Sequence, residues 1–283
     1  MRVAVTGASG FVGSAVVAQL RSLNVDVIAA SRGPMPEAVS SSGSGNLRHC
    51  TLDLATPPSR PFTHLGRPDV LLHLAWQGLP NYRGACHVEE ELPRQIEFLR
   101  RCVDDGLQRL VVSGTCLEYG LREGCLDESL PAQPITAYGQ AKDRLRHSLE
   151  EQAAHGGLQL TWLRLFYLYG QGQAKTSLYA QLRAAIARRD ARFPMSRGDQ
   201  IRDFQPLSTA AQQIAALALH GGSAGIFNIC SGRPQSVLEL VHQWLSEWGA
   251  DIELDRGVYD YPDYEPRAFW GDRRRLDTLL GLA

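Results

Sequence analysis

The chain opens with Arg2-Val3-Ala4-Val5-Thr6-Gly7-Ala8-Ser9-Gly10-Phe11-Val12-Gly13. Residues 2–6 predict a short buried strand, because most of them are apolar or β-branched. Apolar residues then recur at helical spacing from Val12 to Leu23. The glycines between strand and helix permit a tight turn and a close approach of the backbone to a ligand. Free N–H groups at the start of such a helix bind phosphate, so this segment predicts a dinucleotide site.

Apolar strands and helical patterns alternate along the rest of the chain. Strands are predicted at 2–6, 25–30, 46–50, 69–74, 108–113, 159–166 and 226–229. Helices are predicted near 11–22, 87–104, 137–154, 176–189 and 208–220. This alternation predicts an α/β fold with a doubly wound parallel sheet, in which ligands bind at the carboxyl ends of the strands.

The predicted elements also indicate how the chain is divided. We expect residues 1–170 to form a dinucleotide-binding Rossmann domain, which residues 205–232 rejoin. Residues 171–204 and 233–283 would then form a small substrate-binding lobe. The serine- and glycine-rich run at 40–45 falls between two predicted strands, so we interpret it as a loop.

The composition is that of an ordinary globular protein. Of the 283 residues 44% are hydrophobic, and a net charge of −1 gives no attraction to nucleic acid or an anionic membrane. No apolar run approaches the ~20 residues of a membrane-spanning helix, so we expect a cytoplasmic protein. The six cysteines show neither Cys-x-x-Cys nor Cys/His metal spacing, and no metal site is expected.

A tyrosine and a lysine four residues apart, Tyr138 and Lys142, lie in the helix predicted at 137–154. Residues at this spacing share one helix face. An ammonium roughly 4 Å from the phenol contributes ~4 kcal/mol at an effective dielectric of ~20, which would bring the phenol pKa toward neutrality. Thr115, just after the strand at 108–113, would hold the substrate oxygen. The alternative is an ordinary helix in which Tyr138 packs and Lys142 is solvated.

Together these motifs resemble the extended short-chain dehydrogenase/reductases, NAD(P)-dependent epimerases, dehydratases and reductases that act on nucleotide-sugars. The resemblance runs along nearly the whole chain. It is carried further by Asp53-Leu54, His73-Leu74-Ala75, Glu118-Tyr119-Gly120, 164–172, Arg202-Asp203-Phe204 and 227–232. It implies a homodimer, a nucleotide-sugar substrate, and Thr115, Tyr138 and Lys142 as the catalytic residues.

The resemblance also implies the binding residues. Cofactor contacts are expected from Gly7, Ser9, Gly10, Phe11, Val12, Gly13, Ser31, Arg32, Asp53, Leu54, Leu74, Ala75, Trp76, Ser113, Tyr138, Lys142 and Phe166. Substrate contacts are expected from Gln77, Thr115, Cys116, Glu118, Tyr167, Arg202 and Arg267. Arg202 and Arg267 are the candidates for the diphosphate, because guanidinium forks match phosphate oxygens. Glu118 is either a structural residue or a sugar contact, and His73 is either a cofactor contact or a satisfied histidine at a strand end.

The residues after the strand at 25–30 indicate the cofactor. A site for NAD usually places Asp or Glu there to accept a hydrogen bond from the ribose 2′-hydroxyl. This chain has Ser31-Arg32-Gly33 with no acid nearby. A guanidinium pairs well with a 2′-phosphate, so NADP(H) is the predicted cofactor and NAD(H) is also possible. A solvated loop arginine is the alternative.

Departures from the family pattern narrow the reaction. Cys116-Leu117 follow Thr115 where the related dehydratases carry Asp-Glu, and neither side chain can move a proton to a leaving hydroxyl at neutral pH. We therefore interpret the chain as an NADPH-dependent reductase of a nucleotide-linked 4-keto-6-deoxyhexose, for example dTDP-, GDP- or CDP-linked. An NAD-dependent NDP-sugar 4-epimerase and a non-catalytic dinucleotide sensor are the alternatives.

Overall fold

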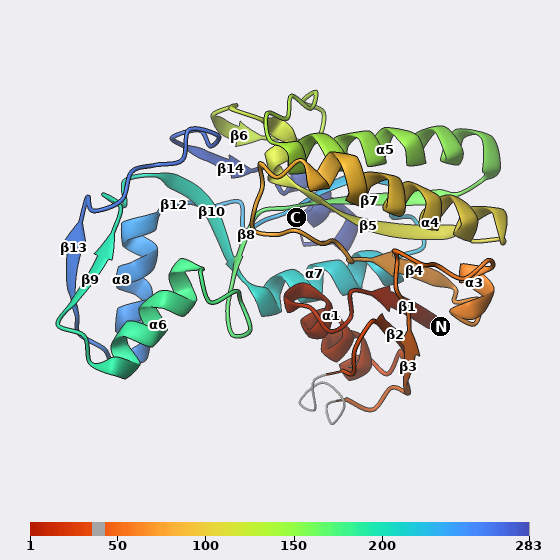
Figure 1. Cartoon of the computed structure of the whole chain (residues 1–283), viewed down its shortest axis with the longest axis horizontal. Coiled ribbons are helices and arrows are strands. Elements are labelled where there is room, and N and C mark those ends of the chain that lie inside the picture. Colours follow the sequence, from red (N-terminus) through yellow and green to blue (C-terminus); the bar gives the residue numbers. More distant parts are fainter. Residues whose placement is uncertain (36–42, 283) are drawn as a thin grey trace.

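The chain folds around a seven-stranded parallel sheet, seen in a computed structural model that describes residues 1–35 and 43–282 (Figure 1). The first three residues of the serine-rich run at 40–45 lie outside the described part. The strands are β1 (Arg2–Thr6), β2 (Asp26–Ser31), β3 (Leu47–Thr51), β4 (Val70–His73), β5 (Arg109–Thr115), β7 (Gln159–Leu165) and β11 (Gly225–Ile229). Their order is β11-β7-β5-β4-β1-β2-β3. β1 pairs with both β2 and β4, so the winding reverses at β1 and the predicted doubly wound sheet is confirmed.

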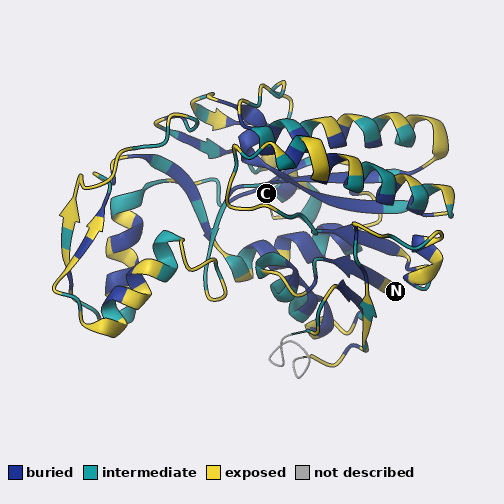
Figure 2. Cartoon of the chain, viewed as in Figure 1, coloured by how far each residue is buried: buried dark blue, intermediate teal, exposed yellow. Residues whose placement is uncertain are grey.

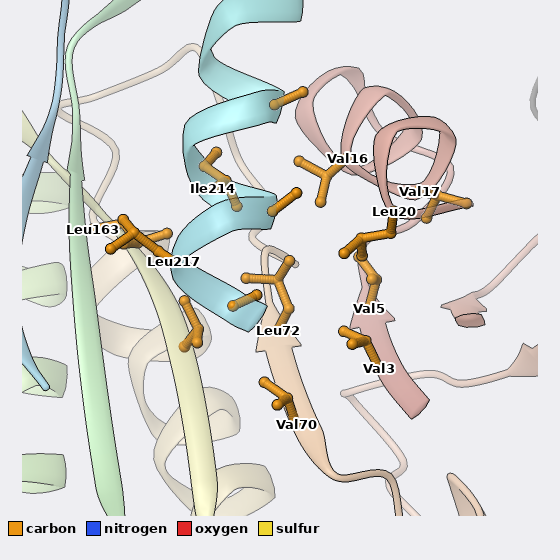
Figure 3. Packing of buried hydrophobic residues seen from close by; sticks show 14 of the residues in the cluster. Val3, Val5, Val16, Val17, Leu20, Val70, Leu72, Leu163, Ile214 and Leu217 are labelled. Atoms are coloured by element: carbon orange, nitrogen blue, oxygen red, sulfur yellow. The ribbon is translucent and has the colours of Figure 1, made fainter. Parts of the chain in front are cut away.

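Helices cover both faces of this sheet. One face carries α1 (Phe11–Ser22), α7 (Leu207–Leu219) and α9 (Arg274–Leu280), and the other carries α3 (Pro61–His64), η1 (His87–Glu91), α4 (Leu92–Asp104) and α5 (Ala137–Gly156). Figure 3 shows the first packing layer, formed by Val16 and Leu20 of α1, Ile214 and Leu217 of α7, and Val5 and Leu72 of the sheet. Colouring by burial shows that the central strands are almost wholly enclosed (Figure 2).

The turn between β1 and α1 needs glycine at two positions. Gly7 has φ +66°, which side chains with a Cβ rarely adopt. A Cβ on Gly13 would lie 2.1 Å from the Gly7 carbonyl oxygen, so only glycine lets the helix pack this closely on the strand. No side chain caps α1 at Gly10, which leaves N–H groups of the first turn without a side-chain acceptor.

A smaller lobe lies beside the sheet, at the left of Figure 1. It contains α6 (Leu178–Arg188), α8 (Val237–Trp248), β9 (Arg192–Met195) and β13 (Glu253–Arg256), which share a separate hydrophobic core. A three-stranded sheet of β8 (Tyr167–Tyr169), β10 (Ile201–Pro206) and β12 (Pro234–Ser236) leads into the lobe. No helix in the described part of the chain is long and apolar enough to cross a membrane.

The end of the chain differs from the expected division at 233. The strand β14 (Phe269–Gly271) pairs with β6 (Gly124–Leu126), and Leu276 of α9 is buried in the core of the large sheet. Residues 269–280 therefore return to the dinucleotide-binding domain. We propose the division with this change, since the rest of the predicted lobe has its own core.

Candidate active site

A cavity of about 220 Å³ opens where β1, β2 and β4 end. Of the residues expected to contact a cofactor, those that line it are Gly7, Ser9, Gly10, Ser31, Arg32, Leu54, Leu74, Ala75 and Trp76. Residues that the sequence did not single out also line it: Thr6, Ala30, Leu52 and Glu91. Gln77, expected to contact the substrate, lies here instead. Asp53 does not line this cavity, and its Oδ1 accepts a hydrogen bond from Ala55 N at 3.0 Å.

The end of β2 carries a base and no acid. Arg32 is exposed, and its Nη1 donates a hydrogen bond to Gln77 Oε1 at 3.4 Å. Within the described residues, Arg32 forms no ion pair closer than 4.0 Å. Ser31 donates to the Gly33 carbonyl at 2.6 Å. The acid that lines this cavity is Glu91, whose Oε1 accepts from Gln77 N at 3.1 Å.

His73 is a satisfied histidine beneath this cavity. Its ring is fully buried, Nδ1 lies 2.9 Å from Thr6 Oγ1, and Nε2 is hydrogen bonded to Gln95 Oε1. Burial lowers the pKa of His73 to about 3, so the ring is neutral. Thr6 Oγ1 also accepts from Leu74 N at 3.2 Å, which fixes the start of the loop after β4. Of the two interpretations of His73, the structure therefore supports the structural one.

Two of the three proposed catalytic residues, Thr115 and Tyr138, line a second cavity of about 210 Å³. Tyr138 lies in the first turn of α5. Thr136 caps the start of this helix, because its Oγ1 accepts a hydrogen bond from Gly139 N at 3.1 Å. Thr115 is the last residue of β5. The expected site residues that line this cavity are Phe11, Val12, Thr115, Cys116, Tyr138, Phe166 and Tyr167. Its other lining residues were not among the expected site residues: Leu79, Tyr82, Gly114, Leu117, Leu165, Leu168 and Glu265.

Lys142 lies beneath these cavities and is fully buried. Its Nζ donates to the Ser113 carbonyl at 2.7 Å and lies 4.0 Å from the centroid of the Trp76 ring. Burial lowers the pKa of Lys142 to about 7, although the charges of Glu118 and Glu91 oppose this shift. Two other residues expected to contact a cofactor have structural partners. The Ser113 carbonyl accepts the hydrogen bond from Lys142, and Gly13 packs against Gly7 of the glycine turn.

The protonation of Tyr138 differs from the sequence expectation. Lys142 Nζ lies 5.9 Å from the centroid of the phenol ring. Burial raises the pKa of Tyr138, and the nearby Tyr82, Glu118 and Cys116 raise it further. The phenol therefore holds its proton at neutral pH. Tyr138 is prepared to act as an acid.

Glu118 does not reach either cavity, which corrects its assignment as a substrate contact. Its side chain is 0% exposed and is enclosed by partners of the protein itself. Glu118 Oε1 accepts from Thr115 N at 2.8 Å and from Trp162 Nε1 at 3.0 Å, and Oε2 pairs with Arg164 Nε at 2.8 Å. The turn η2 (Cys116–Tyr119) is a capping box, which directs this carboxylate back toward the end of β5.

Neither expected diphosphate arginine is free. Arg202 is 2% exposed, and its Nη2 pairs with Glu265 Oε2 at 2.9 Å. Arg267 is exposed on the lobe side and pairs with Asp199 at 3.1 Å. The assignment of Arg202 as a phosphate contact is therefore incorrect for this arrangement, because its guanidinium is satisfied inside the protein. Glu265, its partner, lines the same cavity as Thr115 and Tyr138.

A larger cavity lies away from these residues. It has a volume of about 540 Å³ and is lined by Asp127, Asp272 and Arg275 among others, but by none of the expected site residues. Within residues 1–35 and 43–282, no group of three His, Cys, Asp or Glu side chains is placed to hold a metal ion. Most of the expected site residues line the two smaller cavities instead, and Tyr138 lines the second of them.

Known proteins are similar to this chain in sequence and in fold. The chain is 29% identical over 276 residues to dTDP-6-deoxy-L-talose 4-dehydrogenase (NAD(+)) of Aggregatibacter actinomycetemcomitans, covering 96% of this chain and 99% of that protein. It is 27% identical over 281 residues to UDP-glucose 4-epimerase of Azospirillum brasilense, covering 85% of this chain and 75% of that protein. The solved structure of MoeE5 in complex with UDP-glucuronic acid and NAD has a TM-score of 0.83 at 28% identity, covering 99% of this chain and 93% of that one. Residues 3–230 match a family described as NAD dependent epimerase/dehydratase. The chain belongs to the NAD dependent epimerase/dehydratase family.

Proposed function

We propose that this protein reduces the 4-keto group of a nucleotide-linked 4-keto-6-deoxyhexose to give a 6-deoxysugar. The observation that carries the proposal is that Tyr138, kept protonated by burial, and Thr115 line one cavity. Phe11, which lines that cavity, directly follows Gly10, which lines the cofactor cavity. The relative named for 6-deoxy-L-talose 4-dehydrogenase is named for the oxidation of the same kind of hydroxyl, which is the reverse of this reduction.

The reaction uses three side chains of the chain itself. A bound reduced nicotinamide supplies the hydride for the keto carbon. Thr115 Oγ1 accepts from Leu117 N at 3.2 Å, so its O–H remains available to orient the keto oxygen. Tyr138 donates its proton to that oxygen. The ammonium of Lys142 would stabilise the phenolate that remains and would help to hold the ribose of a bound cofactor.

The substrate cavity favours a sugar with a methyl group in place of its 6-hydroxyl. Its lining contains Leu79, Phe166 and other apolar side chains, and its charged member is the acid Glu265. No lysine or arginine lines it among the described residues, so a uronic acid carboxylate would lack a charge partner there. Cys116 cannot act as an acid or base for water elimination, because burial raises the pKa of its thiol. The keto substrate must therefore come from a separate dehydration reaction.

We propose NADP(H) as the preferred cofactor, with NAD(H) also accepted, because Arg32 lines the cofactor cavity and has no acidic partner within residues 1–35 and 43–282. Replacing Arg32 by Ala should weaken NADPH binding by about 2 kcal/mol, a loss of roughly 30-fold, and leave NADH binding nearly unchanged. Fluorescence titration of the protein with each cofactor measures both values. The exposed Arg197 of the lobe, changed to Ala, serves as the control. Equal losses for the two cofactors, or tighter NADH binding by the unaltered protein, would remove this proposal.

A 4-epimerase is the second candidate, since one relative is a UDP-glucose 4-epimerase. An epimerase oxidises and re-reduces the same sugar and consumes no reduced cofactor, whereas a reductase oxidises one NADPH for each product. We expect the purified protein to oxidise NADPH mole for mole with an NDP-4-keto-6-deoxyhexose, as followed by nicotinamide absorbance and product analysis. We expect no interconversion of UDP-glucose and UDP-galactose. Interconversion without any change in absorbance would establish the epimerase and refute the reductase.

Two further expectations concern the oligomeric state and the location of the protein. A homodimer is proposed because it is usual in the resembling family, and light scattering of the purified protein tests it. A cytoplasmic location is proposed from the sequence. A non-catalytic dinucleotide sensor would bind the cofactor without turnover, so the same absorbance experiment separates it from the enzyme.

A further inference from the structure

The ammonium of Lys142 has few electrostatic partners for a fully buried charge. It donates one hydrogen bond, to the Ser113 carbonyl at 2.7 Å. Within the described part of the chain, no carboxylate lies within 4.0 Å of it. The titratable groups that act on it through space are Glu118, Glu91, His73 and Tyr138. Besides that carbonyl, the face of the Trp76 ring lies close to the ammonium, with its centroid 4.0 Å from Nζ.

The Trp76 ring is fixed at its edges as well as at its face. Its edge meets Tyr138, with 5.7 Å between the ring centroids and 72° between the planes. Its Nε1 lies 3.1 Å from Nδ1 of the fully buried His87. An indole nitrogen can only donate, so His87 Nδ1 must accept. The proton of the neutral His87 ring then lies on Nε2, which donates to the Asn81 carbonyl at 2.8 Å.

This arrangement links the proton donor to the loop that lines the substrate cavity. Asn81 and Leu79 belong to the same loop, and Leu79 lines that cavity. Tyr82, the next residue, lines it too, and its carbonyl accepts from Tyr138 N at 3.0 Å. A Cβ on Gly78 would lie 2.8 Å from the His87 ring, so glycine is needed where the loop passes His87. The loop, His87, Trp76 and Lys142 are therefore in continuous contact.

We propose that Trp76 is a positioning residue, whose ring face keeps the Lys142 ammonium charged and in place, and whose bond to His87 holds that ring in register with the substrate loop. A cation over an indole face is stabilised by the negative potential of the ring, and more so where water is excluded. The role deepens the proposed reduction, because Lys142 must be charged to stabilise the phenolate of Tyr138.

The lysine content of the chain allows a direct test. Lys142 and Lys175 are its two lysines, and Lys175 is exposed. Carbon-13 labelling of the lysine side chains therefore gives one NMR titration for Lys142 and one internal reference. Trp76→Leu should lower the pKa of Lys142 by about one unit from its value in the unaltered protein, and Trp76→Phe by less, since a smaller ring face remains. Lys175 should not change.

The sign of the shift decides between two roles for Trp76. If the ring only shields Lys142 from water, its removal lets water in and the pKa of Lys142 rises. A rise, or no change, in both Trp76 variants would overturn the proposal. If Trp76→Leu does not fold, the pKa of Lys142 is measured in Trp76→Phe instead. Trp248→Leu is the matched control, because Trp248 contacts Arg183 in the lobe and not Lys142.

A substitution of His87 tests the hydrogen bond between Trp76 Nε1 and His87 Nδ1. His87→Phe keeps a ring against Trp76 and removes the acceptor of its N–H. We expect a smaller fall in the pKa of Lys142 than in Trp76→Leu, together with a rise in KM for the sugar that exceeds the fall in kcat. If neither the pKa of Lys142 nor the KM for the sugar changes in His87→Phe, the proposed link between Trp76 and the loop is refuted. The titration needs no substrate, so it can succeed even if the proposed reductase activity fails, and the two ideas are tested separately.

Discussion

Tyr138→Phe is expected to lower turnover at least ~100-fold, the scale of a lost general acid. The substitution removes one oxygen and leaves the ring, which packs against Trp76 at 5.7 Å, His87 at 5.3 Å and Tyr82 at 5.7 Å between centroids. The fold and cofactor binding should therefore be kept. Initial rates of NADPH oxidation with the 4-keto sugar, together with cofactor titration, measure the two effects separately.

A neighbouring tyrosine gives the matched control for this variant. Tyr82 lines the same cavity and contacts Tyr138, and burial raises its pKa to about 12. Tyr82→Phe also removes one phenolic oxygen, but not the proposed donor, so it should lose much less activity. A Tyr138→Phe protein that retains most of its turnover would place the proton transfer elsewhere. Equal losses in the two variants would indicate a general effect of the aromatic cluster.

The parts of the fold that depend on local sequence were predictable. The strand, glycine turn and helix at the start of the chain have the predicted boundaries, and α4 and α5 lie where the apolar spacing indicated. Local rules suffice here, because turn geometry and one-sided apolar faces are set by neighbours in sequence. The helix α8 was missed although Ser236 and Glu239 form a capping box, a signal visible in the sequence.

The partners of buried charges were not predictable in the same way. Glu118 finds Arg164 across the sheet, 46 positions away, and Arg202 finds Glu265, 63 positions away. A motif gives a residue type at a position, but the direction of its side chain depends on which other groups the fold brings near it. Glu265 lines the proposed substrate cavity because the fold places it beside Arg202. No sequence pattern near Glu265 predicted that position.

The glycine of Ser113-Gly114-Thr115 belongs to the same buried arrangement. A Cβ on Gly114 would lie 2.2 Å from Trp162 Nε1 and 2.5 Å from Glu118 Oε1. The ion pair and the indole therefore occupy space that any larger residue would need. The position of Thr115 in the substrate cavity depends on this packing, because Glu118 also holds its amide.

Glu118→Gln is accordingly expected to destabilise the protein by about 3–5 kcal/mol, the cost of removing one partner of a buried ion pair. Gln keeps the shape of the side chain, but Arg164 is 1% exposed and would hold a charge without a counter-ion. Its Nη1 already lacks a hydrogen-bond partner in the described structure. Against a total stability of about 5–15 kcal/mol this loss is large, and a lower urea midpoint measures it.

A second substitution separates the charge from the shape of Glu118. In Glu118→Gln combined with Arg164→Met both charges are absent, so most of the lost stability should return, because the remaining penalty is one of packing and hydrogen bonds. Glu97→Gln on the outer face of α4 removes an exposed partner of Arg100 and Arg101 and should leave the urea midpoint close to that of the unaltered protein. If Glu118→Gln unfolds at the same urea concentration as the unaltered protein, the ion pair does not hold the end of β5. If the double variant is less stable than Glu118→Gln alone, the loss comes from packing around Arg164 and not from its unpaired charge.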